Sequence, residues 1–207
     1  MKKNSNANNV YQEELTKMAT QFDRGHIGMN IWHDIEEDRI HSKDFTAVIE
    51  IPKASKCKYE LDKHTGILQL DRILYTSTHY PANYGFIPRT YADDGDPLDV
   101  LVLCSEPIYP MTLIRVYPIG VMRMLDGGKM DDKIIAVPFS DPTYLGIESI
   151  DALPPHIFDE IVHFFSVYKQ LENKQTAVQS LFGPAKAIEI IEEAIDCYRK
   201  TFVEGKA

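Results

Sequence analysis

The residues best suited to chemistry in this chain stand close together in one acidic turn. Three carboxylates, Asp94, Asp96 and Asp99, lie within six residues, in the run Asp-Gly-Asp-Pro-Leu-Asp that precedes an apolar segment. Glycine allows a tight turn and proline stiffens it, so the carboxylates can converge. Converging like charges repel unless a cation lies between them, and oxygen ligands suit hard cations such as Mg²⁺, Mn²⁺ or Ca²⁺. The turn therefore predicts a divalent-metal site.

Other motifs share parts of this pattern. An EF-hand loop that began at Asp94 would need glycine in place of Asp99 and glutamate in place of Ser105, so that motif is excluded. A phosphate-accepting aspartate normally ends an apolar strand, whereas this cluster precedes one. An isolated Asp-Gly-Asp is most often a solvated surface turn. The Asp-x-Asp metal site of a nucleotide-sugar transferase stays open from these residues alone.

More acids lie elsewhere in the chain. Asp126 and Asp131 stand in a loop just before Lys133, which taken alone is equally typical of a solvated hairpin. Glu50 lies inside an apolar segment, where it either faces water or joins a site. Lys58 and Glu60 share one face of their segment because side chains alternate along a strand. Acids and a lysine on adjoining strands are unusual for a face that is only solvated.

Donors suited to an anion complete the candidates. Arg72, Tyr80 and Tyr84 stand on or after one predicted strand, and Tyr168 with Lys169 stands near the end of a predicted helix. A guanidinium can donate to two phosphate oxygens at once, and phenolic hydroxyls can donate as well. Taken singly, each tyrosine is more typical of packing, and Lys169 of the charge preferred at a helix end.

Composition limits the class of protein. The chain of 207 residues is long enough for one domain, and 22 basic against 31 acidic residues give a net charge of -9, which disfavours nucleic acid as a partner. The three cysteines are far apart and predict buried reduced thiols. The first residues lack the apolar core of a signal peptide, and no apolar run approaches membrane-spanning length. We expect a cytoplasmic protein without a membrane partner.

The apolar periodicity predicts mainly strands between helices. A helix is expected at residues 11–22, and β-branched segments predict strands at 45–51, 58–61, 67–74, 98–104, 113–124 and 133–139. Helical spacing returns at 157–171, after two prolines, and at 187–198, after Gly183 and Pro184. This order indicates an α+β fold that is mainly β, a small closed or partly open barrel with helices packed outside it.

Several segments together resemble family I soluble inorganic pyrophosphatases. They are residues 47–52, 58–60, 80–85, 94–102 and 126–133, in matching order and spacing, within a resemblance that runs from about 32 to 172. The resemblance implies an OB-like barrel, a catalytic domain at 32–207 after a tail and accessory helix at 1–31, and hydrolysis of pyrophosphate to two phosphates. It also implies several Mg²⁺ ions per site, with Mn²⁺ or Zn²⁺ as substitutes.

The resemblance assigns roles residue by residue. Asp94, Asp99 and Asp131 would hold the central metal ion, and Asp99 would also face a second one. Asp126 with Asp131 would serve the ions that arrive with substrate, and Glu50 would assist. Asp96 would accept a proton from the attacking water. The phosphoryl groups would be bound by Lys58, Arg72, Tyr84, Lys133, Tyr168 and Lys169, with Glu60 and Tyr80 in support. These roles agree with general chemistry, because pyrophosphate repels hydroxide until cations neutralise its charge.

One departure from the family pattern and two rival functions remain to be considered. Hexameric bacterial relatives often carry a histidine before the Tyr-Lys pair, where this chain has Val167, and a homo-oligomer, expected to be a hexamer, is still predicted. The rivals are a metal-dependent nucleotide phosphohydrolase or transferase and a non-enzymatic OB-like binding module. The first would be favoured by a glycine-rich phosphate loop and the second by a basic, aromatic face, and the sequence shows neither.

Overall fold

The computed structural model describes residues 29–204. The helix expected at 11–22 lies outside this range, so it and the boundary between 1–31 and 32–207 stay predictions. Among the described residues, no helix is both long and apolar enough to cross a membrane. The cysteines are free thiols, but the prediction that they are buried is wrong: Cys57 and Cys104 are half-buried, and Cys197 is exposed on the surface of a helix.

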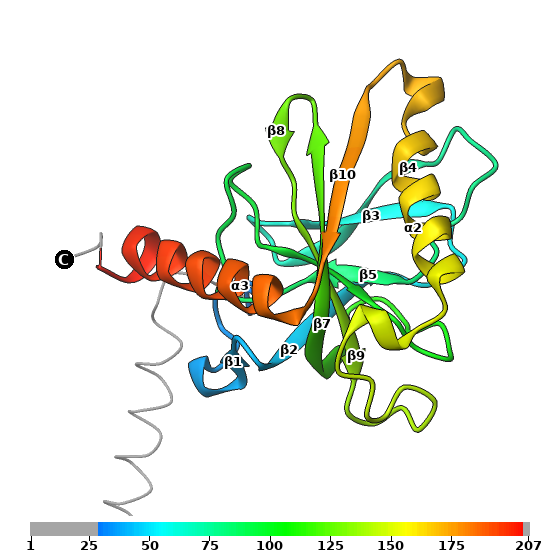
Figure 1. Ribbon diagram of the computed structural model, residues 1–207. Coiled ribbons are helices and arrows are strands. Elements are labelled where there is room, and N and C mark those ends of the chain that lie inside the picture. Colours follow the sequence, from blue (N-terminus) through cyan, green and yellow to red (C-terminus); the bar gives the residue numbers. More distant parts are fainter. Residues whose placement is uncertain (1–28, 205–207) are drawn as a thin grey trace, which may run out of the picture.

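Strands make up the centre of the molecule (Figure 1). They are β1 (Ile40–His41), β2 (Asp44–Ile51), β3 (Cys57–Asp62), β4 (Ile67–Ile73), β5 (Asn83–Phe86), β6 (Asp99–Val102), β7 (Leu113–Asp126), β8 (Lys129–Met130), β9 (Lys133–Pro138) and β10 (Thr176–Phe182). The helices are α2 (Pro155–Val167) and α3 (Pro184–Tyr198), with short turns η1 (Glu37–Arg39), η2 (Ile150–Ala152), η3 (Gln170–Glu172) and η4 (Arg199–Val203). All six predicted strands and both predicted C-terminal helices are present.

The pairings close a ring of strands. β2 pairs with β5, β5 with β6, β6 with β9, β9 with β7, and β7 returns to β2. Only the β6–β9 pair is parallel within this ring. The ring confirms the predicted small barrel of OB-like type, and β1, β8 and β10 extend its edges. β3 and β4 form a separate hairpin beside it.

Alternation along the strands divides the core in two. On β6, Val100 and Val102 pack in a cluster that contains the apolar side of α3, whereas Leu101 packs in the cluster that contains α2. Such a period of two is expected of a strand that is buried on both faces. The two helices therefore lie on opposite sides of the strands (Figure 1).

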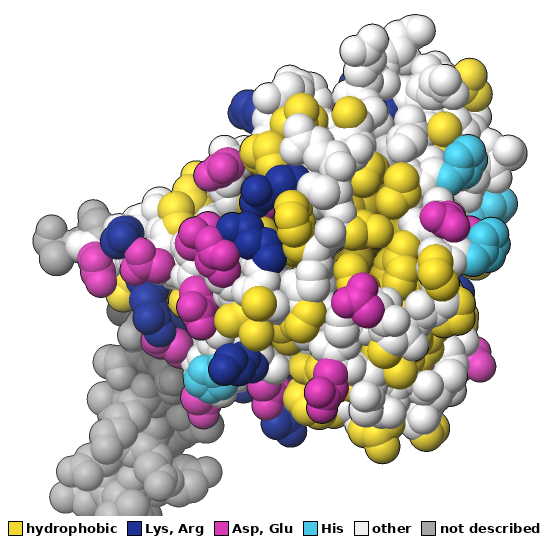
Figure 2. All heavy atoms as spheres, in the orientation of Figure 1, with side chains coloured by type: hydrophobic (Ala, Val, Ile, Leu, Met, Phe, Trp, Pro, Cys, Tyr) yellow, Lys and Arg dark blue, Asp and Glu magenta, His cyan; other side chains and the backbone are white. Residues whose placement is uncertain are grey.

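The outer surface differs between these two sides. On the face in Figure 2, acidic and basic side chains gather over α3, and hydrophobic side chains and histidines gather on the α2 side. α2 starts at Pro155, where a missing N–H costs nothing, and buries Phe158, Ile161, Phe164 and Phe165. This aromatic side of α2 packs against side chains of the strands, and the ring of Phe165 lies 5.5 Å from Nζ of Lys133.

Four strands were not predicted: β1 and β8, which have two residues each, and β5 and β10. β5 has only four residues and contains Gly85, and a Cβ at Gly85 would stand 1.8 Å from the carbonyl oxygen of Val48 on β2. Glycine is needed there because the two backbones approach so closely. β10 is half-exposed and its pairing with β7 is shifted between Val178 and Ser180, so its hydrophobic alternation is weak.

Candidate active site

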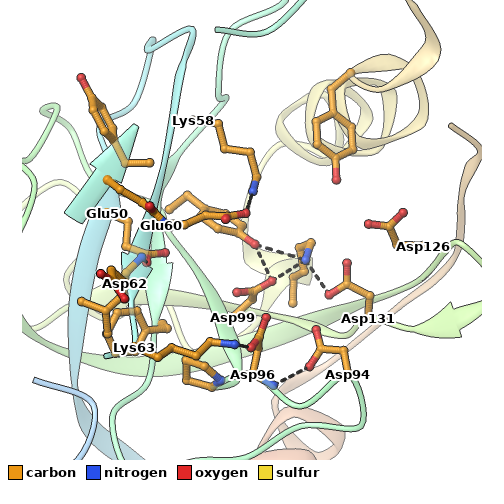
Figure 3. Close-up of a pocket in the computed structure, with 18 of the residues that line it drawn as sticks. Glu50, Lys58, Glu60, Asp62, Lys63, Asp94, Asp96, Asp99, Asp126 and Asp131 are labelled. Carbon is orange, nitrogen blue, oxygen red and sulfur yellow. Dashed lines mark hydrogen bonds and ion pairs between the residues drawn. The ribbon is translucent and has the colours of Figure 1, made fainter. Parts of the chain in front are cut away.

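One cavity of about 550 Å³ gathers nearly all of the predicted site residues (Figure 3). It opens at the end of the barrel, between the β3–β4 hairpin, the acidic turn and the end of α2. Its lining includes Glu50, Lys58, Glu60, Tyr84, Asp94, Asp96, Asp99, Asp126, Asp131, Lys133, Tyr168 and Lys169. Arg72 and Tyr80, also predicted, are not part of this lining.

Local backbone geometry shapes the acidic turn. Gly95 has a φ of 89°, a left-handed conformation that glycine adopts without strain. The backbone N–H of Asp96 donates to Oδ1 of Asp94 at 3.0 Å, which folds the turn tightly. The N–H of Leu98 donates to the hydroxyl of the buried Thr90 at 2.8 Å, so the turn is tied to the core where β6 begins. Asp94, Asp96 and Asp99 consequently face the same space (Figure 3).

The parallel pairing of β6 with β9 brings the second acidic loop to the first. Asp99 stands opposite Lys133 in this register, although the two are far apart in the chain. Asp126 ends β7, and the short hairpin of β7 and β8 then returns the chain to Asp131, directly before β9. Tertiary pairing therefore unites two loops that sequence alone treats separately.

Lys133 is the centre of the resulting network. Its side chain is 2% exposed, and Nζ lies 2.6 Å from Oδ2 of Asp99, 2.7 Å from Oδ1 of Asp131 and 3.3 Å from the hydroxyl of Tyr84. Tyr84 donates its hydroxyl proton to Asp99. Burial acts to lower the pKa of Lys133, but Asp99 and Asp131 outweigh it and raise the pKa above the usual value.

The carboxyl groups carry more negative charge than the lysines neutralise. Burial, followed by the charge of Asp99, raises the pKa of Glu50 to about 8. Desolvation and the charge of Asp131 raise the pKa of Asp94. Burial also raises the pKa of Asp131, with Lys133 opposing and Asp99 adding to the shift. A cation bound among these carboxyl groups would lower their pKa values again, because it favours the charged form.

The donor set therefore fits hard divalent cations. All candidate ligands are carboxylate oxygens, which suit Mg²⁺ or Mn²⁺ more than soft metals. As placed, however, no three Asp, Glu, His or Cys side chains within residues 29–204 surround a common metal position. Asp99 and Asp131 instead share the ammonium group of Lys133, and Asp126 is paired with Lys169. Metal binding is therefore supported by the carboxylate donor atoms and the excess of negative charge in the cavity, and not by a complete coordination geometry.

Further lysines stand at the cavity wall. Lys58 pairs with Glu60 on the same face of β3, as alternation predicted, and its Nζ is also 3.2 Å from Asp71. Lys169 pairs with Asp126 across the cavity. Acidic and basic side chains therefore both line the cavity. Such a lining suits an anionic substrate that binds together with metal cations.

Arg72 and Tyr80 lie behind this wall. Tyr80 is 2% exposed, and its ring is 5.4 Å from that of Tyr84. Its pKa is raised by burial first and then by the proximity of Tyr168. Arg72 pairs with Asp71, which also lies 3.2 Å from Nζ of the cavity residue Lys58, so Arg72 stands close to the site without lining the cavity.

Sequence reasoning missed several residues at the site. Lys63 pairs with Asp96, and Asp62 and His64 line the cavity beside it. These residues lie where β3 turns into β4, so strand alternation does not predict where they point. The only available signal was their position directly after Lys58 and Glu60 on the same hairpin.

Curated relatives match most of the chain. The protein is 49% identical over 175 residues to soluble inorganic pyrophosphatase 2 of Chlamydomonas reinhardtii, covering 84% of this chain and 91% of the relative. It is 47% identical over 182 residues to soluble inorganic pyrophosphatase 5 of Arabidopsis thaliana, covering 88% of this chain and 84% of the relative.

Solved structures give the same result for the fold. The inorganic pyrophosphatase of Thermus thermophilus matches with a TM-score of 0.78 and 35% identity, covering 83% of this chain and 99% of that one. The Helicobacter pylori enzyme matches with a TM-score of 0.75 and 43% identity, over 77% and 96%. The family model for inorganic pyrophosphatase matches residues 47–199, a segment that contains every predicted site residue. The chain therefore belongs to the inorganic pyrophosphatase family.

Proposed function

We propose that this protein hydrolyses inorganic pyrophosphate to two orthophosphates in the cavity described above, with Mg²⁺ as its physiological metal ion. The observation that carries this proposal is the meeting of acids from three separate segments with lysines and tyrosines in one cavity, inside the segment that matches the family. Acids alone would bind cations without binding phosphate, and basic groups alone would leave the substrate's charge to repel a nucleophile.

The acidic residues would hold the metal ions. Asp94, Asp99 and Asp131 are the proposed ligands of a central ion, with Asp126 serving further ions and Glu50 assisting from the barrel wall. When bound, Mg²⁺ neutralises pyrophosphate and makes a water molecule more acidic. Mn²⁺ or Zn²⁺ are the proposed substitutes.

Asp96 would act as the general base. Its side chain lies at the cavity edge, is 48% exposed and can reach a water molecule in the cavity. As an ionised carboxylate it would take the proton from the attacking water. Its ion pair with Lys63 holds the side chain beside the turn, on the hairpin side of the cavity.

The remaining side chains would bind and orient the phosphoryl groups. Lys58 on β3 and Lys169 after the end of α2 both line the cavity, and they would contact the two phosphoryl groups of a pyrophosphate. Lys133 and Tyr168 offer donors from the buried floor, where burial strengthens each interaction, and Tyr84 is the third proposed donor beside them. Arg72 supplies a guanidinium from behind the wall, and Glu60 and Tyr80 hold the neighbouring groups in place.

A homo-oligomer, expected to be a hexamer, is proposed as the working form, and the cytoplasm as its location. Large apolar side chains on the surface support assembly, among them Tyr109 at 84% exposed and Leu145 at 66%. Light scattering of the purified protein measures the assembly directly, and a monomeric mass would contradict it.

The test of function is phosphate release from pyrophosphate by purified protein. With Mg²⁺ present, pyrophosphate should be hydrolysed much faster than ATP, and a chelator should abolish the activity until Mg²⁺ is restored. Faster hydrolysis of ATP would instead favour the nucleotide phosphohydrolase. If no phosphate is released with Mg²⁺, Mn²⁺ or Zn²⁺, the proposed function is wrong.

A further inference from the structure

Arg72 has an unusual set of hydrogen-bond partners. Its Nε donates to Oε1 of Glu172 at 2.9 Å, and its Nη1 is paired with Asp71. The third nitrogen, Nη2, is buried and has no partner within the described chain. A buried unpaired donor is costly, so this nitrogen is where an acceptor from outside the chain would be stabilised most.

Glu172 reaches Arg72 from a distant part of the sequence. It lies in the short turn η3, a few residues after Lys169, and its side chain is only 8% exposed. The backbone N–H of Glu172 donates to the carbonyl of Lys169 at 2.9 Å, so this turn folds back on a residue that lines the cavity. Arg72 belongs to the β3–β4 hairpin, outside the barrel ring. The pair therefore joins the hairpin to the segment that ends α2.

The two carboxylates around Arg72 are not equivalent. Asp71 is 30% exposed and is shared with Lys58, whose Nζ is 3.2 Å away. Glu172 is more buried, and within residues 29–204 Arg72 is its only ion-pair partner. If the Glu172 carboxylate were lost, the guanidinium could rotate toward Asp71, because the fork of Arg donors forms equivalent hydrogen bonds in more than one orientation.

We propose that Glu172 is a positioning residue: it fixes the Arg72 guanidinium so that its unpaired Nη2 edge donates to a phosphoryl oxygen of the substrate. The inference rests on the proposed function, since it names how one of the anion donors is held. Glu172 was not among the acidic residues or the anion donors that the sequence predicted for the site. Glu172 acts through Arg72 and does not itself contact the substrate.

A purely structural role makes a different prediction. If Glu172 only fastened the hairpin to the end of α2, its loss would lower thermal stability and leave the KM for pyrophosphate unchanged well below the melting temperature. If it positions Arg72, its loss changes binding of the anion in a protein that is still folded. The two roles are separated by measuring KM, kcat and Tm on the same variants.

The experiment compares Glu172→Gln, Glu172→Asp, Arg72→Lys and the Arg72→Lys/Glu172→Gln double variant, with Mg²⁺ saturating. Glu160→Gln is the matched control, because it removes the same charge from an exposed position on α2. We expect Glu172→Gln to lower kcat/KM for pyrophosphate about tenfold, mainly through KM, as one charge-assisted hydrogen bond is lost. Glu172→Asp should keep part of the activity, and the control should stay within about twofold.

The double variant decides whether Glu172 works through Arg72. Arg72→Lys removes the fork but keeps a positive charge beside Glu172, and its Tm reports whether the fold is kept. If the inference is correct, adding Glu172→Gln to Arg72→Lys lowers kcat/KM by less than about twofold, because the effects of coupled residues do not add. Full additivity of the two losses, or an unchanged KM in Glu172→Gln, would overturn it.

A second measurement does not depend on turnover. Inorganic phosphate should raise the Tm of the wild-type protein through binding to the native state, and Glu172→Gln should reduce this shift. If the wild type failed to hydrolyse pyrophosphate, the proposed function would be refuted. The phosphate-induced shift in Tm would still test whether Glu172 positions Arg72 for an anion. An equal shift in wild type and Glu172→Gln counts against the inference.

Discussion

Replacement of Asp96 by asparagine isolates the proposed chemical step. The substitution keeps the size of the side chain and removes its ability to accept a proton. The hydrogen bond between Asp94 and the backbone N–H of residue 96 does not involve the side chain that changes. The turn should therefore keep its shape, and Asp96→Asn should lower kcat about 10²- to 10⁴-fold, the range typical of a lost general base.

The cost in stability should be small. The interaction that is lost is the pair with Lys63, and the two side chains are 46% and 48% exposed. Exposed ion pairs contribute about 0–1 kcal/mol, so the Tm should change by no more than about 4 °C in a chain of this size. A large loss of activity with a nearly unchanged Tm is the expected combination.

The assay is the initial rate of phosphate release from pyrophosphate with Mg²⁺, together with thermal unfolding of each variant. Asp93→Asn is the matched control. It removes the same charge from the same turn, but Asp93 is exposed and does not line the main cavity. Activity of Asp96→Asn above about a tenth of wild type, or an equal loss in Asp93→Asn, would refute the role of Asp96 as general base.

Three further predictions concern stability. Gly85→Ala should destabilise the fold by about 3 kcal/mol or more, because its Cβ would overlap a neighbouring backbone oxygen. Gly183→Ala is the control and should change the Tm little, because the space around its Cβ is open. Equal Tm values for the two variants would contradict this prediction. The carboxylate of Asp141 accepts two backbone N–H bonds, and its pKa is lowered chiefly by the bond from Ser105 N–H. Its contribution is present above the ordinary pKa and lost at lower pH, so Asp141→Asn should be less stable at pH 7, with the difference shrinking in acid denaturation curves below about pH 4. Arg72→Gln should destabilise more than Arg72→Gln/Glu172→Gln in denaturant titrations, because the single variant leaves a buried carboxylate unpaired; the reverse order would show that Glu172 is not effectively buried.

Local patterns explain why much of the fold could be predicted. The strands that became β2, β6, β7 and β9 are rich in β-branched residues and are buried on both faces, so their apolar runs stand out in the sequence. α2 and α3 each follow prolines that suit a helix start and carry apolar residues at helical spacing. Strong local signals and the tertiary fold agree in these elements.

Elements with weak local signals were missed for a physical reason. β5 is short and contains a glycine, because its backbone lies very close to that of β2. The need for this glycine comes from the partner strand and cannot be seen in the composition of β5 itself. β10 is an edge strand with intermediate burial, so neither face has a strict apolar pattern. In both cases the reason for the strand lies in its neighbours.

The site residues also differ in whether local or tertiary structure brings them together. Asp94, Asp96 and Asp99 could be assigned to one site from the sequence because the turn that unites them is local, built by Gly95 and one side-chain to backbone hydrogen bond. The contact of Lys63 with Asp96 depends instead on how the β3–β4 hairpin folds over the barrel. Hydrophobic alternation carries no information about the direction of a side chain in such a turn.

The residue order of this chain was enough to specify which groups could do the chemistry: carboxylates for cations, amines, phenols and a guanidinium for an anion. Only the folded chain decided which of them share a cavity, because Asp99 meets Lys133 through a parallel strand pair and Arg72 meets Glu172 across 100 residues. The chemical type of each side chain is known from its position in the sequence. The distances between side chains depend instead on strand register and helix packing, which are determined by burial of the whole core.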